Sequence, residues 1–567
     1  MKSTTFQTIT NNHGFKIDIL ENGLIQKIEN KHIRLSLKPE TIFGDGGFQL
    51  FLRKLDTTIR YKPITGFESD FFINTSDGCY SSKGTFENVI YELTISISDK
   101  TDALKCGVRI VSKNETDAQF DLIIRQDVGL KTVNDGLVNE YYVSQYLERR
   151  IFDDANYGKV ICCRQNIKEK TGHPWMMMFC GNGAIAGSTD GRLFYGPMYR
   201  ELKVSDALIN KVLGGEYASE SPVVALQSNP FSLKAGEMQS VDFYLFMLSD
   251  HPQASSEADL MRIPEIVKSF IDIKVNKTGE TCYRGRKNIF NTAVLQSNDL
   301  TSSEIDELFI GEKRQQEYYN DREISFFYGQ SKHVVLRTKE LLVDRPHGHI
   351  IQAQAGLQAD ENILSTTCYA SGVFNSHLVQ GNTNFNVLLS INTTQFNQNP
   401  EQGQRVFVEI DGQFMLLGLP SAFEMGVNFC RWIYKTDKHL IQVRTWTSKD
   451  SATVYTDAKV LKGSNIRFVA TFDLDPLNNW SVLPSADSKE FVFLPSADSM
   501  TMDKFPNARY RLILPQNQYV EALKSGIEGQ NMYENSGLLG LKTELTDKFE
   551  LLFIGELKEQ FQVNVPQ

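Results

Sequence analysis

The nine residues VIYELTISI at positions 89–97 decide the fold class of this chain. Apolar residues stand at every second position from Val89 to Ile97, and mostly polar residues stand between them. Because successive side chains of a strand point to opposite faces, this alternation predicts a β-strand with one buried and one wet face. A sheet with one wet face is typical of antiparallel β structure.

The same alternation recurs along the first 250 residues. Phe15, Ile17 and Ile19 show it just before Asn22-Gly23, a dipeptide that suits the positive φ angles of a hairpin turn. Further strands are expected within Phe120–Ile124 and within Val241–Leu248. Many short strands with hardly any helical period between them predict an antiparallel β-sandwich over residues 1–252.

The pattern changes between residues 253 and 344, which we expect to form a mixed, partly helical connector. Apolar residues from Leu260 to Phe270 recur at helical spacing after Ser255-Ser256-Glu257. A second helix is expected to begin at Thr301-Ser302-Ser303-Glu304. In this capping-box spacing the hydroxyl and the carboxylate each accept from a free backbone N–H.

Strand patterns resume in residues 345–567, with clear alternation over Val406–Ile410 and over Ile466–Phe472. We expect a second β-sandwich there. The predicted fold class is therefore mainly β, with two antiparallel sandwiches joined by the connector. No long helical array is expected in this chain.

Composition excludes several functions. The chain has 59 Lys and Arg against 69 Asp and Glu, a net charge of −10, which gives no basic surface for nucleic acid or acidic membranes. No run approaches eighteen apolar residues, so we expect no membrane span and a cytoplasmic protein. The eight cysteines include no CxxC pair and are predicted to be reduced, buried thiols.

The densest group of histidines is Arg345-Pro346-His347-Gly348-His349. In an extended segment His347 and His349 would share one face, where they could form the edge of a metal site or a clamp for sugar hydroxyls with Arg345. A polar loop that closes the second sandwich is the favoured interpretation. No other metal spacing is present, and we expect no metal and no cofactor.

Glu424 is the acidic residue most embedded in apolar sequence, within residues 421–432. Its carboxylate could serve carbohydrate chemistry, but an ion pair with Arg431 is the favoured interpretation. We include Arg431 and Trp432 with the histidine group as candidate carbohydrate contacts. A Ser-His-Asp triad is not indicated, because no GxSxG elbow occurs.

Several of these segments resemble one family. Residues 368–386, 403–407, 411–413 and 421–435 are similar to the amino-terminal half of 1,2-β-oligoglucan phosphorylases. Asn22-Gly23-Leu24 and residues 46–53 also resemble the first domain of that family. These enzymes are relatives of cellobiose phosphorylase and of cyclic β-1,2-glucan synthase, in glycoside hydrolase family ninety-four.

The resemblance implies galactose-mutarotase-like sandwiches followed, in the complete enzyme, by an (α/α)6 barrel. That barrel holds the general acid, an Asp, and the residues that bind inorganic phosphate, the co-substrate. Since the sequence shows no series of six helical hairpins, no catalytic residue is assigned to this chain. The implied partners are a β-glucooligosaccharide, the barrel as a domain or companion chain, and a second copy in a homodimer.

Three hypotheses follow. In the first, the chain is the non-catalytic β region of a phosphorylase that converts β-1,2-glucooligosaccharides to glucose 1-phosphate. In the second, it is a stand-alone carbohydrate-binding or assembly protein. In the third, it is a mutarotase-like or lyase enzyme that joins a His and a carboxylate on one concave face.

Overall fold

The computed structural model describes residues 5–75, 78–113, 117–132, 140–271, 282–284, 287–353, 362–381, 385–391, 396, 398–524 and 532–557. The chain divides into two compact units. The N-terminal unit comprises Thr4–Tyr199 and Val204–Lys287, and the C-terminal unit comprises chiefly Asn288–Gln567, with Arg200–Lys203. Residues 382–384, part of the family resemblance, lie outside the described residues.

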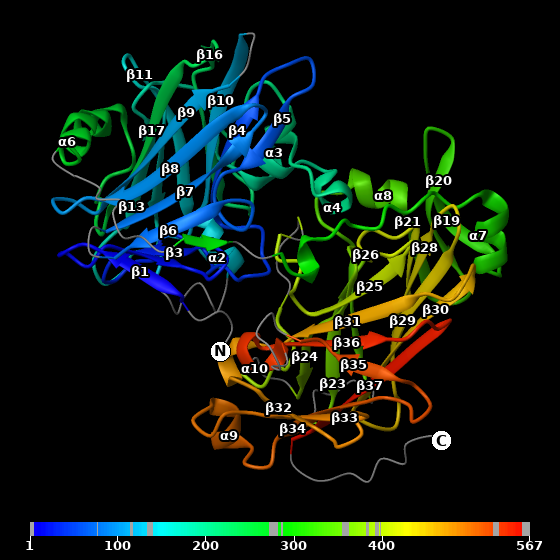
Figure 1. Ribbon diagram of the computed structural model, residues 1–567. Helices are drawn as coiled ribbons and strands as arrows, with labels where there is room; N and C mark the ends of the chain where they lie inside the picture. Colours follow the sequence, from blue (N-terminus) through cyan, green and yellow to red (C-terminus); the bar gives the residue numbers. More distant parts are fainter. Residues whose placement is uncertain are drawn as a thin grey trace. The chain divides into compact units, whose positions relative to one another are not determined.

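The N-terminal unit is built from short antiparallel strands (Figure 1). They are β1 (Gln7–Thr10), β2 (Lys16–Ile19), β3 (Ile25–Glu29), β4 (Phe48–Lys54), β5 (Arg60–Pro63), β6 (Asp70–Asn74), β7 (Cys79–Phe86), β8 (Val89–Ile97), β9 (Ala103–Ser112), β10 (Ala118–Asp127), β11 (Leu147–Asp154), β12 (Gly158–Gln165), β13 (Trp175–Cys180), β14 (Ala184–Ser188), β15 (Val223–Ser228), β16 (Phe231–Leu233), β17 (Met238–Leu248) and β18 (Cys282–Arg284).

Two series of antiparallel pairings form this unit. One runs from β6 through β7, β8, β9, β17, β13 and β12 to β11. The other runs from β1 through β2, β3, β4 and β10 to β15 and β14. Strand β8 has the predicted bounds, and its odd-numbered residues are buried in one apolar core. The alternation in the sequence therefore identified this strand and its buried face.

Short helices accompany these strands. They are α2 (Glu140–Gln145), α3 (Gly191–Tyr195), α4 (Tyr199–Leu202), α5 (Asp206–Ile209), η1 (Glu257–Arg262) and α6 (Ile263–Lys268). The helical spacing after Ser255 is confirmed, since η1 and α6 follow one another there and bury Ile263 and Ile266.

The C-terminal unit contains nineteen further described strands and several short helices. The strands are β19 (Lys313–Tyr319), β20 (Arg322–Tyr328), β21 (Lys332–Leu336), β22 (Gly348–Gln352), β23 (Leu364–Tyr369), β24 (Val373–Gln380), β25 (Gln404–Ile410), β26 (Gln413–Leu416), β27 (Ala422–Met425), β28 (Phe429–Lys435), β29 (Leu440–Thr447), β30 (Thr453–Lys462), β31 (Arg467–Asp473), β32 (Ser481–Pro484), β33 (Glu490–Leu494), β34 (Arg509–Ile513), β35 (Val520–Ala522), β36 (Leu538–Thr543) and β37 (Lys548–Glu556). The helices are η2 (Ile289–Asn291), α7 (Ser302–Leu308), α8 (Arg337–Leu342), η3 (Pro476–Asn478), α9 (Met500–Lys504) and α10 (Met532–Ser536).

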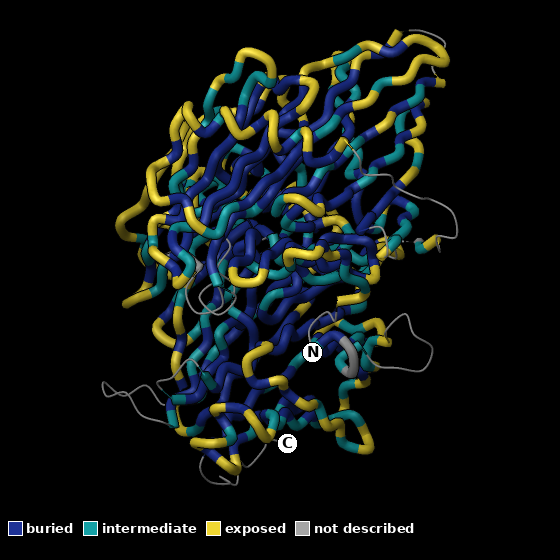
Figure 2. The backbone as a smooth tube through the Cα atoms, turned by 90° about the vertical axis from the view of Figure 1, so that its left-hand side faces the viewer, coloured by how far each residue is buried: buried dark blue, intermediate teal, exposed yellow. Residues whose placement is uncertain are grey.

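These strands form two large sheets. An eleven-stranded sheet has the order β19-β20-β21-β27-β28-β29-β30-β37-β34-β33-β32, and an eight-stranded sheet is built on β22-β23-β24-β25-β31-β36-β35 with β26 beside β25. Alternate residues of both sheets, such as Trp432, Val443, Val406 and Phe468, share one buried core. In Figure 2 the strand interiors are buried and the exposed residues gather in the turns. This unit is therefore a sandwich.

The predicted connector contributes directly to this sandwich. Strands β19, β20 and β21 lie within residues 253–344 and form one end of the eleven-stranded sheet. Their sequence resembles a connector because β19 is exposed on both faces and shows no apolar alternation. The capping box is confirmed: Thr301 caps α7, and its side chain and that of Glu304 accept from each other's backbone N–H.

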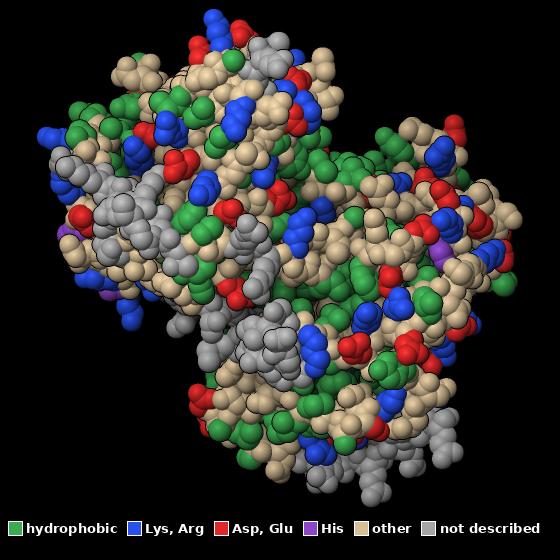
Figure 3. All heavy atoms as spheres, in the orientation of Figure 1, with side chains coloured by type: hydrophobic (Ala, Val, Ile, Leu, Met, Phe, Trp, Pro, Cys, Tyr) green, Lys and Arg blue, Asp and Glu red, His purple; other side chains and the backbone are tan. Residues whose placement is uncertain are grey.

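The mainly β, antiparallel fold is thus confirmed. Within the described ranges the longest α-helix, α7, has seven residues, so these ranges contain no helical barrel. No helix in the same part of the chain is long and apolar enough to cross a membrane. All eight cysteines are free thiols; seven are buried as predicted, whereas Cys282 is exposed. On the face drawn in Figure 3, acidic and basic side chains of the described residues are interspersed.

Candidate functional site

The face of the eleven-stranded sheet that points away from the sandwich core carries polar and aromatic side chains. Along β28 and β29, Trp432 and Val443 point into the core, so their neighbours Arg431 and Arg444 point to the outer face. Helix α7 covers one part of this face, where Ile305 and Phe309 pack on Phe326 and Val334. Next to α7 the face is open.

Two rows of side chains cross this open part from strand to strand. The polar row consists of Glu424, Arg431, Arg444 and Asp457, which are successive partners in the register of β27, β28, β29 and β30. The aromatic row consists of Phe429, Trp446 and Tyr455, which are partners on β28, β29 and β30. Neighbouring strands are about 4.8 Å apart, and the rows are two residues, about 7 Å, apart along each strand.

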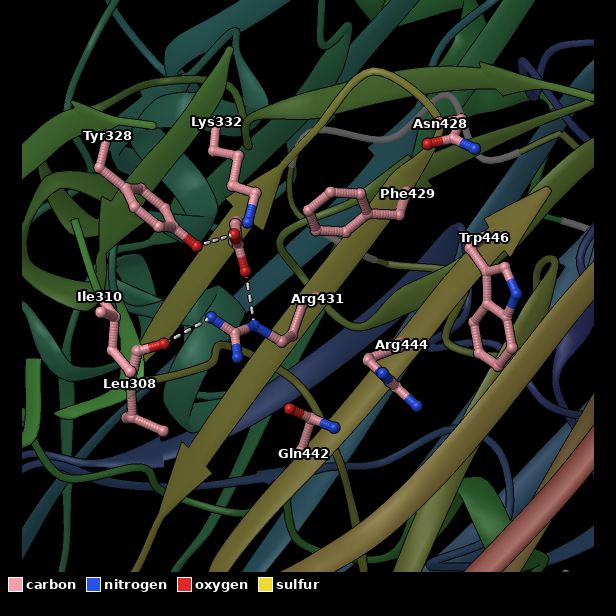
Figure 4. Close-up of a pocket in the computed structure, with 11 residues that line it drawn as sticks. Leu308, Ile310, Tyr328, Lys332, Asn428, Phe429, Arg431, Gln442, Arg444 and Trp446 are labelled. Atoms are coloured by element: carbon pink, nitrogen blue, oxygen red, sulfur yellow. Dashed lines mark hydrogen bonds and ion pairs between the residues drawn. The ribbon is translucent and has the colours of Figure 1, made fainter. Parts of the chain in front are cut away.

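A hollow of about 530 Å³ lies over the part of these rows on β27, β28 and β29 (Figure 4). Its volume is within the range of small-ligand sites. Its lining is formed by Leu308, Ile310, Tyr328, Lys332, Glu424, Asn428, Phe429, Arg431, Gln442, Arg444 and Trp446. All of these residues belong to the C-terminal unit.

Glu424 is the centre of a group of hydrogen-bonded side chains in the hollow. Its carboxylate accepts a hydrogen bond from Arg431 Nε at 2.5 Å and another from the Tyr328 hydroxyl. Arg431 also donates from Nη2 to the carbonyl of Leu308, the last residue of α7, at 2.9 Å, and its guanidinium lies 4.9 Å from the centre of the Phe309 ring. The side chain of Glu424 is 2% exposed and that of Arg431 17%.

Tyr328 is a hydrogen-bond donor in this group. Burial, and then the adjacent Glu424 carboxylate, raise the pKa of its phenol well above the ordinary value. The hydroxyl therefore keeps its proton and directs it to Glu424. These contacts fix both oxygens of a buried carboxylate, one with a guanidinium and one with a phenol.

Arg444 is held in the same way by a second buried carboxylate. Its Nε and Nη2 atoms donate to the two oxygens of Asp457, at 3.0 and 2.5 Å, while 43% of the Arg444 side chain stays exposed. A guanidinium has five N–H groups in a rigid fork, so this bidentate pair leaves three for a ligand. The arrangement supplies oriented donors at the surface of the sheet.

Aromatic rings stand beside these donors. Trp446 lies 5.1 Å from the Arg444 guanidinium and stacks against Tyr455, with ring centres 5.3 Å apart and planes 9° apart. The Lys332 ammonium lies over the rings of Tyr328 and Phe429, at 5.0 and 5.9 Å. The hollow thus combines apolar ring surface with fixed hydrogen-bond donors and acceptors, which suits a ligand that has both C–H faces and hydroxyl groups.

Arg431 and Trp432, both predicted to contact carbohydrate, lie on opposite sides of the sheet. Arg431 lines the hollow. Trp432 is 0% exposed, packs on Phe374 and Phe423 and donates from Nε1 to the carbonyl of Tyr369 at 3.0 Å. As adjacent residues of one strand they cannot share a face, so Trp432 is a core residue here and not part of the hollow.

The histidine group is also divided. His347 precedes β22, and its Nδ1 is hydrogen bonded to the buried carboxylate of Glu340. His349 lies within β22, and its Nε2 contacts the carbonyl of Gly426 at 2.6 Å. Arg345 is exposed in the turn before them. None of the three lines the hollow, and His349 belongs to a strand of the eight-stranded sheet, so a role in carbohydrate contact stays a prediction.

The residues that the sequence did not single out are Tyr328, Arg444, Trp446 and Tyr455. A signal was present on β29, where Gln442, Arg444 and Trp446 alternate with Ile441 and Val443. A Trp on the polar side of such an alternation indicates an exposed ring. Their meeting with Glu424 depends on strand register, which the sequence does not show.

Comparison with known proteins gives matches over both units. Residues 18–245 match the family described as the SOGP N-terminal domain, and residues 310–555 match the glycoside phosphorylase supersandwich domain. A 1,2-beta-oligoglucan phosphorylase of Listeria innocua serovar 6a (strain ATCC BAA-680 / CLIP 11262) is 27% identical over 452 residues. This match covers 78% of the chain and 40% of that protein, so the chain spans about two fifths of its relative's length.

Among solved structures, a bacterial glucoamylase complexed with acarbose is 12% identical, with a TM-score of 0.31 over 48% of this chain and 36% of the other. A galactose mutarotase-like protein from Lactobacillus casei ATCC 334 is 10% identical, with a TM-score of 0.24 over 43% of this chain and 99% of the other. Scores at this level add nothing to the family assignment.

Proposed function

Because the chain belongs to the glycoside phosphorylases that carry an SOGP N-terminal domain and a supersandwich domain, we propose that it is the β-sandwich region of a phosphorylase acting on β-1,2-glucooligosaccharides. The observation that carries the proposal is the pair of domain matches, in this order, over residues 18–245 and 310–555. The linkage of the sugar rests on the name of the Listeria relative.

The role we assign to this chain is structural and carbohydrate-binding. In the complete enzyme, phosphate would attack the anomeric carbon while a carboxylic acid protonates the departing glycosidic oxygen, releasing glucose 1-phosphate. The acid and the phosphate-binding residues would belong to a helical catalytic domain, as a further part of the protein or a companion chain. The described residues of this chain would supply the surface on which that domain and the oligosaccharide are held.

The ion pairs Glu424–Arg431 and Asp457–Arg444, whose carboxylates are buried, support a binding role over a catalytic one. Each oxygen of both carboxylates accepts a hydrogen bond from a fixed partner. A general acid must instead reach the proton of a substrate. The His347–Glu340 contact does not line the hollow, which disfavours the lyase alternative.

The test is an assay of the intact chain with inorganic phosphate and sophoro-oligosaccharides, with and without the catalytic part of a homologous phosphorylase. We expect no glucose 1-phosphate from the chain alone and a stimulated rate when the catalytic part is added. Turnover by the chain alone would overturn the non-catalytic role. Stimulation with laminari- or cello-oligosaccharides, but not with sophoro-oligosaccharides, would overturn the β-1,2 assignment.

A further inference from the structure

The outer face of β27–β30 presents two parallel rows whose chemistry differs. The polar row offers the N–H groups of Arg431 and Arg444, which the buried carboxylates of Glu424 and Asp457 hold in place. The aromatic row of Phe429, Trp446 and Tyr455 offers ring surface. Both rows run across the strands, and the hollow lies over their β27, β28 and β29 members, next to Tyr455 and Asp457 on β30. A ligand that used both rows would therefore lie across the strands.

The chemistry of the rows matches a β-linked glucan. A glucopyranose ring has two faces of C–H groups and an edge of hydroxyls. C–H faces pack on aromatic rings, and hydroxyls both donate and accept hydrogen bonds. With the rows about 7 Å apart, one sugar ring can contact Trp446 with a C–H face and Arg444 with its hydroxyl edge.

The charges of the hollow favour a neutral ligand. The cations Arg431 and Arg444 are each paired with a carboxylate, Glu424 and Asp457, at 2.5 Å. Lys332 is the remaining cation in the lining, and its ammonium lies over two aromatic rings. A phosphate or a polyanionic chain would meet two guanidinium groups whose charge is already balanced.

The spacing of the strands sets the length of the ligand. Adjacent strands are about 4.8 Å apart, comparable with the length of one pyranose unit. The row from Phe429 through Trp446 to Tyr455 spans three strands, and the polar row beside it spans four. A chain of three or more units would contact Arg431 and Arg444 together, whereas a single sugar would contact one of them.

We propose that this face is an oligosaccharide subsite, which binds a linear neutral β-glucan of at least three units lying across β28, β29 and β30. The inference rests on the proposed function, because it names where on this chain the substrate class is held. It also gives three residues a role in binding. Arg444 and Trp446 would contact the glucan directly, and Tyr455 would contact it or support the ring of Trp446.

The experiment is titration calorimetry of the intact chain with glucose, sophorose and the sophoro-oligosaccharides of three to six units. We expect binding to strengthen from the disaccharide to the trisaccharide or tetrasaccharide and then to level off. The Trp446→Ala and Arg444→Met variants should each weaken trisaccharide binding about tenfold or more. Trp446→Phe, which keeps a ring, should recover part of the loss.

Matched controls lie in the same unit but outside the hollow. Trp480→Phe alters a buried ring that donates to Val387, and Lys438→Met removes an exposed cation paired with Asp411. Neither should change the affinity. Because Arg444→Met leaves Asp457 buried without its partner, the Arg444→Met/Asp457→Asn double variant is measured as well, and it should bind as weakly as the single variant.

Several outcomes would overturn the inference. The first is that Trp446→Ala and both Arg444 variants bind the trisaccharide as tightly as the parent chain. The second is that the chain binds glucose and the trisaccharide with equal affinity. The third is that it binds glucose 1-phosphate more tightly than the trisaccharide. Its failure can be distinguished from failure of the proposed function, because that function is judged by glucose 1-phosphate release with the added catalytic part. A chain that stimulates phosphorolysis but binds the trisaccharide equally well in Trp446→Ala and in both Arg444 variants would keep its function and lack this subsite.

Discussion

Removing the Arg431 guanidinium tests how the hollow is stabilised. In Arg431→Met the Glu424 carboxylate, 2% exposed, loses its charged partner and keeps only the Tyr328 hydroxyl. Breaking a buried ion pair by removing one partner costs about 3–5 kcal/mol. Since 17% of the Arg431 side chain is exposed, we expect the lower end, about 3 kcal/mol.

The matching change at Glu424 should cost less. Glu424→Gln keeps an oxygen that accepts from Arg431 or Tyr328, and Arg431 can turn its charge toward water, so we expect about 1–2 kcal/mol. The double variant Arg431→Met/Glu424→Gln has no unpaired buried charge. The sum of the two single destabilisations should therefore exceed the destabilisation of the double variant by about 2 kcal/mol, the coupling expected for groups in direct contact.

Urea unfolding of the intact chain measures these free energies. Three of the four tryptophans, Trp432, Trp446 and Trp480, lie in the C-terminal unit, so a Trp175→Phe background makes the fluorescence specific for that unit. With a urea dependence of about 3 kcal/mol per molar, a 3 kcal/mol loss lowers the midpoint by about 1 M.

The control is Lys438→Met, which breaks an ion pair of the same unit whose side chains are 64% and 71% exposed. Such surface pairs contribute about 0–1 kcal/mol, so this midpoint should fall by no more than about 0.3 M. If Arg431→Met shifted the midpoint no further than Lys438→Met does, Glu424 would not depend on Arg431, and the reasoning from burial would be refuted.

Four further outcomes are expected. Thr301→Ala should destabilise the C-terminal unit by about 1 kcal/mol in urea through loss of the α7 cap, whereas Ser303→Ala in the same helix should change little. Trp432→Phe should lower stability by about 1 kcal/mol because the partly buried carbonyl of Tyr369 loses its donor, while calorimetry shows unchanged glucan affinity. Burial and the nearby cationic groups lower the pKa of His333 to about 4, below the 6.5 of the unfolded chain, so the unfolded chain takes up this proton first. The free energy of unfolding should therefore fall as the pH drops from 6.5 to 4, and it should fall less in a His333→Gln variant. Urea unfolding of both proteins at several pH values across that range measures the difference. A thiol reagent should modify only Cys282 in the folded protein and eight thiols in urea, as counted by mass spectrometry; rapid modification of a second thiol would contradict the burial of the others.

The elements that the sequence predicted are those with a local cause. The strand over Val89–Ile97 follows from side-chain alternation, and the start of α7 follows from the hydroxyl and carboxylate of Thr301 and Glu304. Strand β19 has no such signal, because it is exposed on both faces and forms the end of its sheet. The expected boundaries of the connector, residues 253 and 344, stay a prediction.

The candidate site was predicted only in part. The pairing of Glu424 with Arg431 was favoured from proximity in the sequence and is present as cross-strand partners of a hairpin. Trp432 was grouped with Arg431 although adjacent residues of a strand face opposite sides. Trp446, Arg431 and Tyr328 line one hollow only through the register of five strands. One of the four pairings, β21 with β27, joins segments far apart in the sequence, which local patterns do not predict.

The two ion pairs on the outer face are better explained by binding than by folding. Replacing a buried ion pair by apolar residues of similar volume is often neutral or stabilising, so stability alone does not account for Glu424–Arg431 and Arg444–Asp457. What apolar residues cannot supply is a guanidinium fixed in direction with N–H groups left for a ligand. A Glu424→Leu/Arg431→Leu variant should therefore be about as stable as the parent in urea and still lose affinity for the trisaccharide. If that variant kept the affinity, the pair would have no part in binding, and the assignment of the polar row would be limited to Arg444 and Asp457.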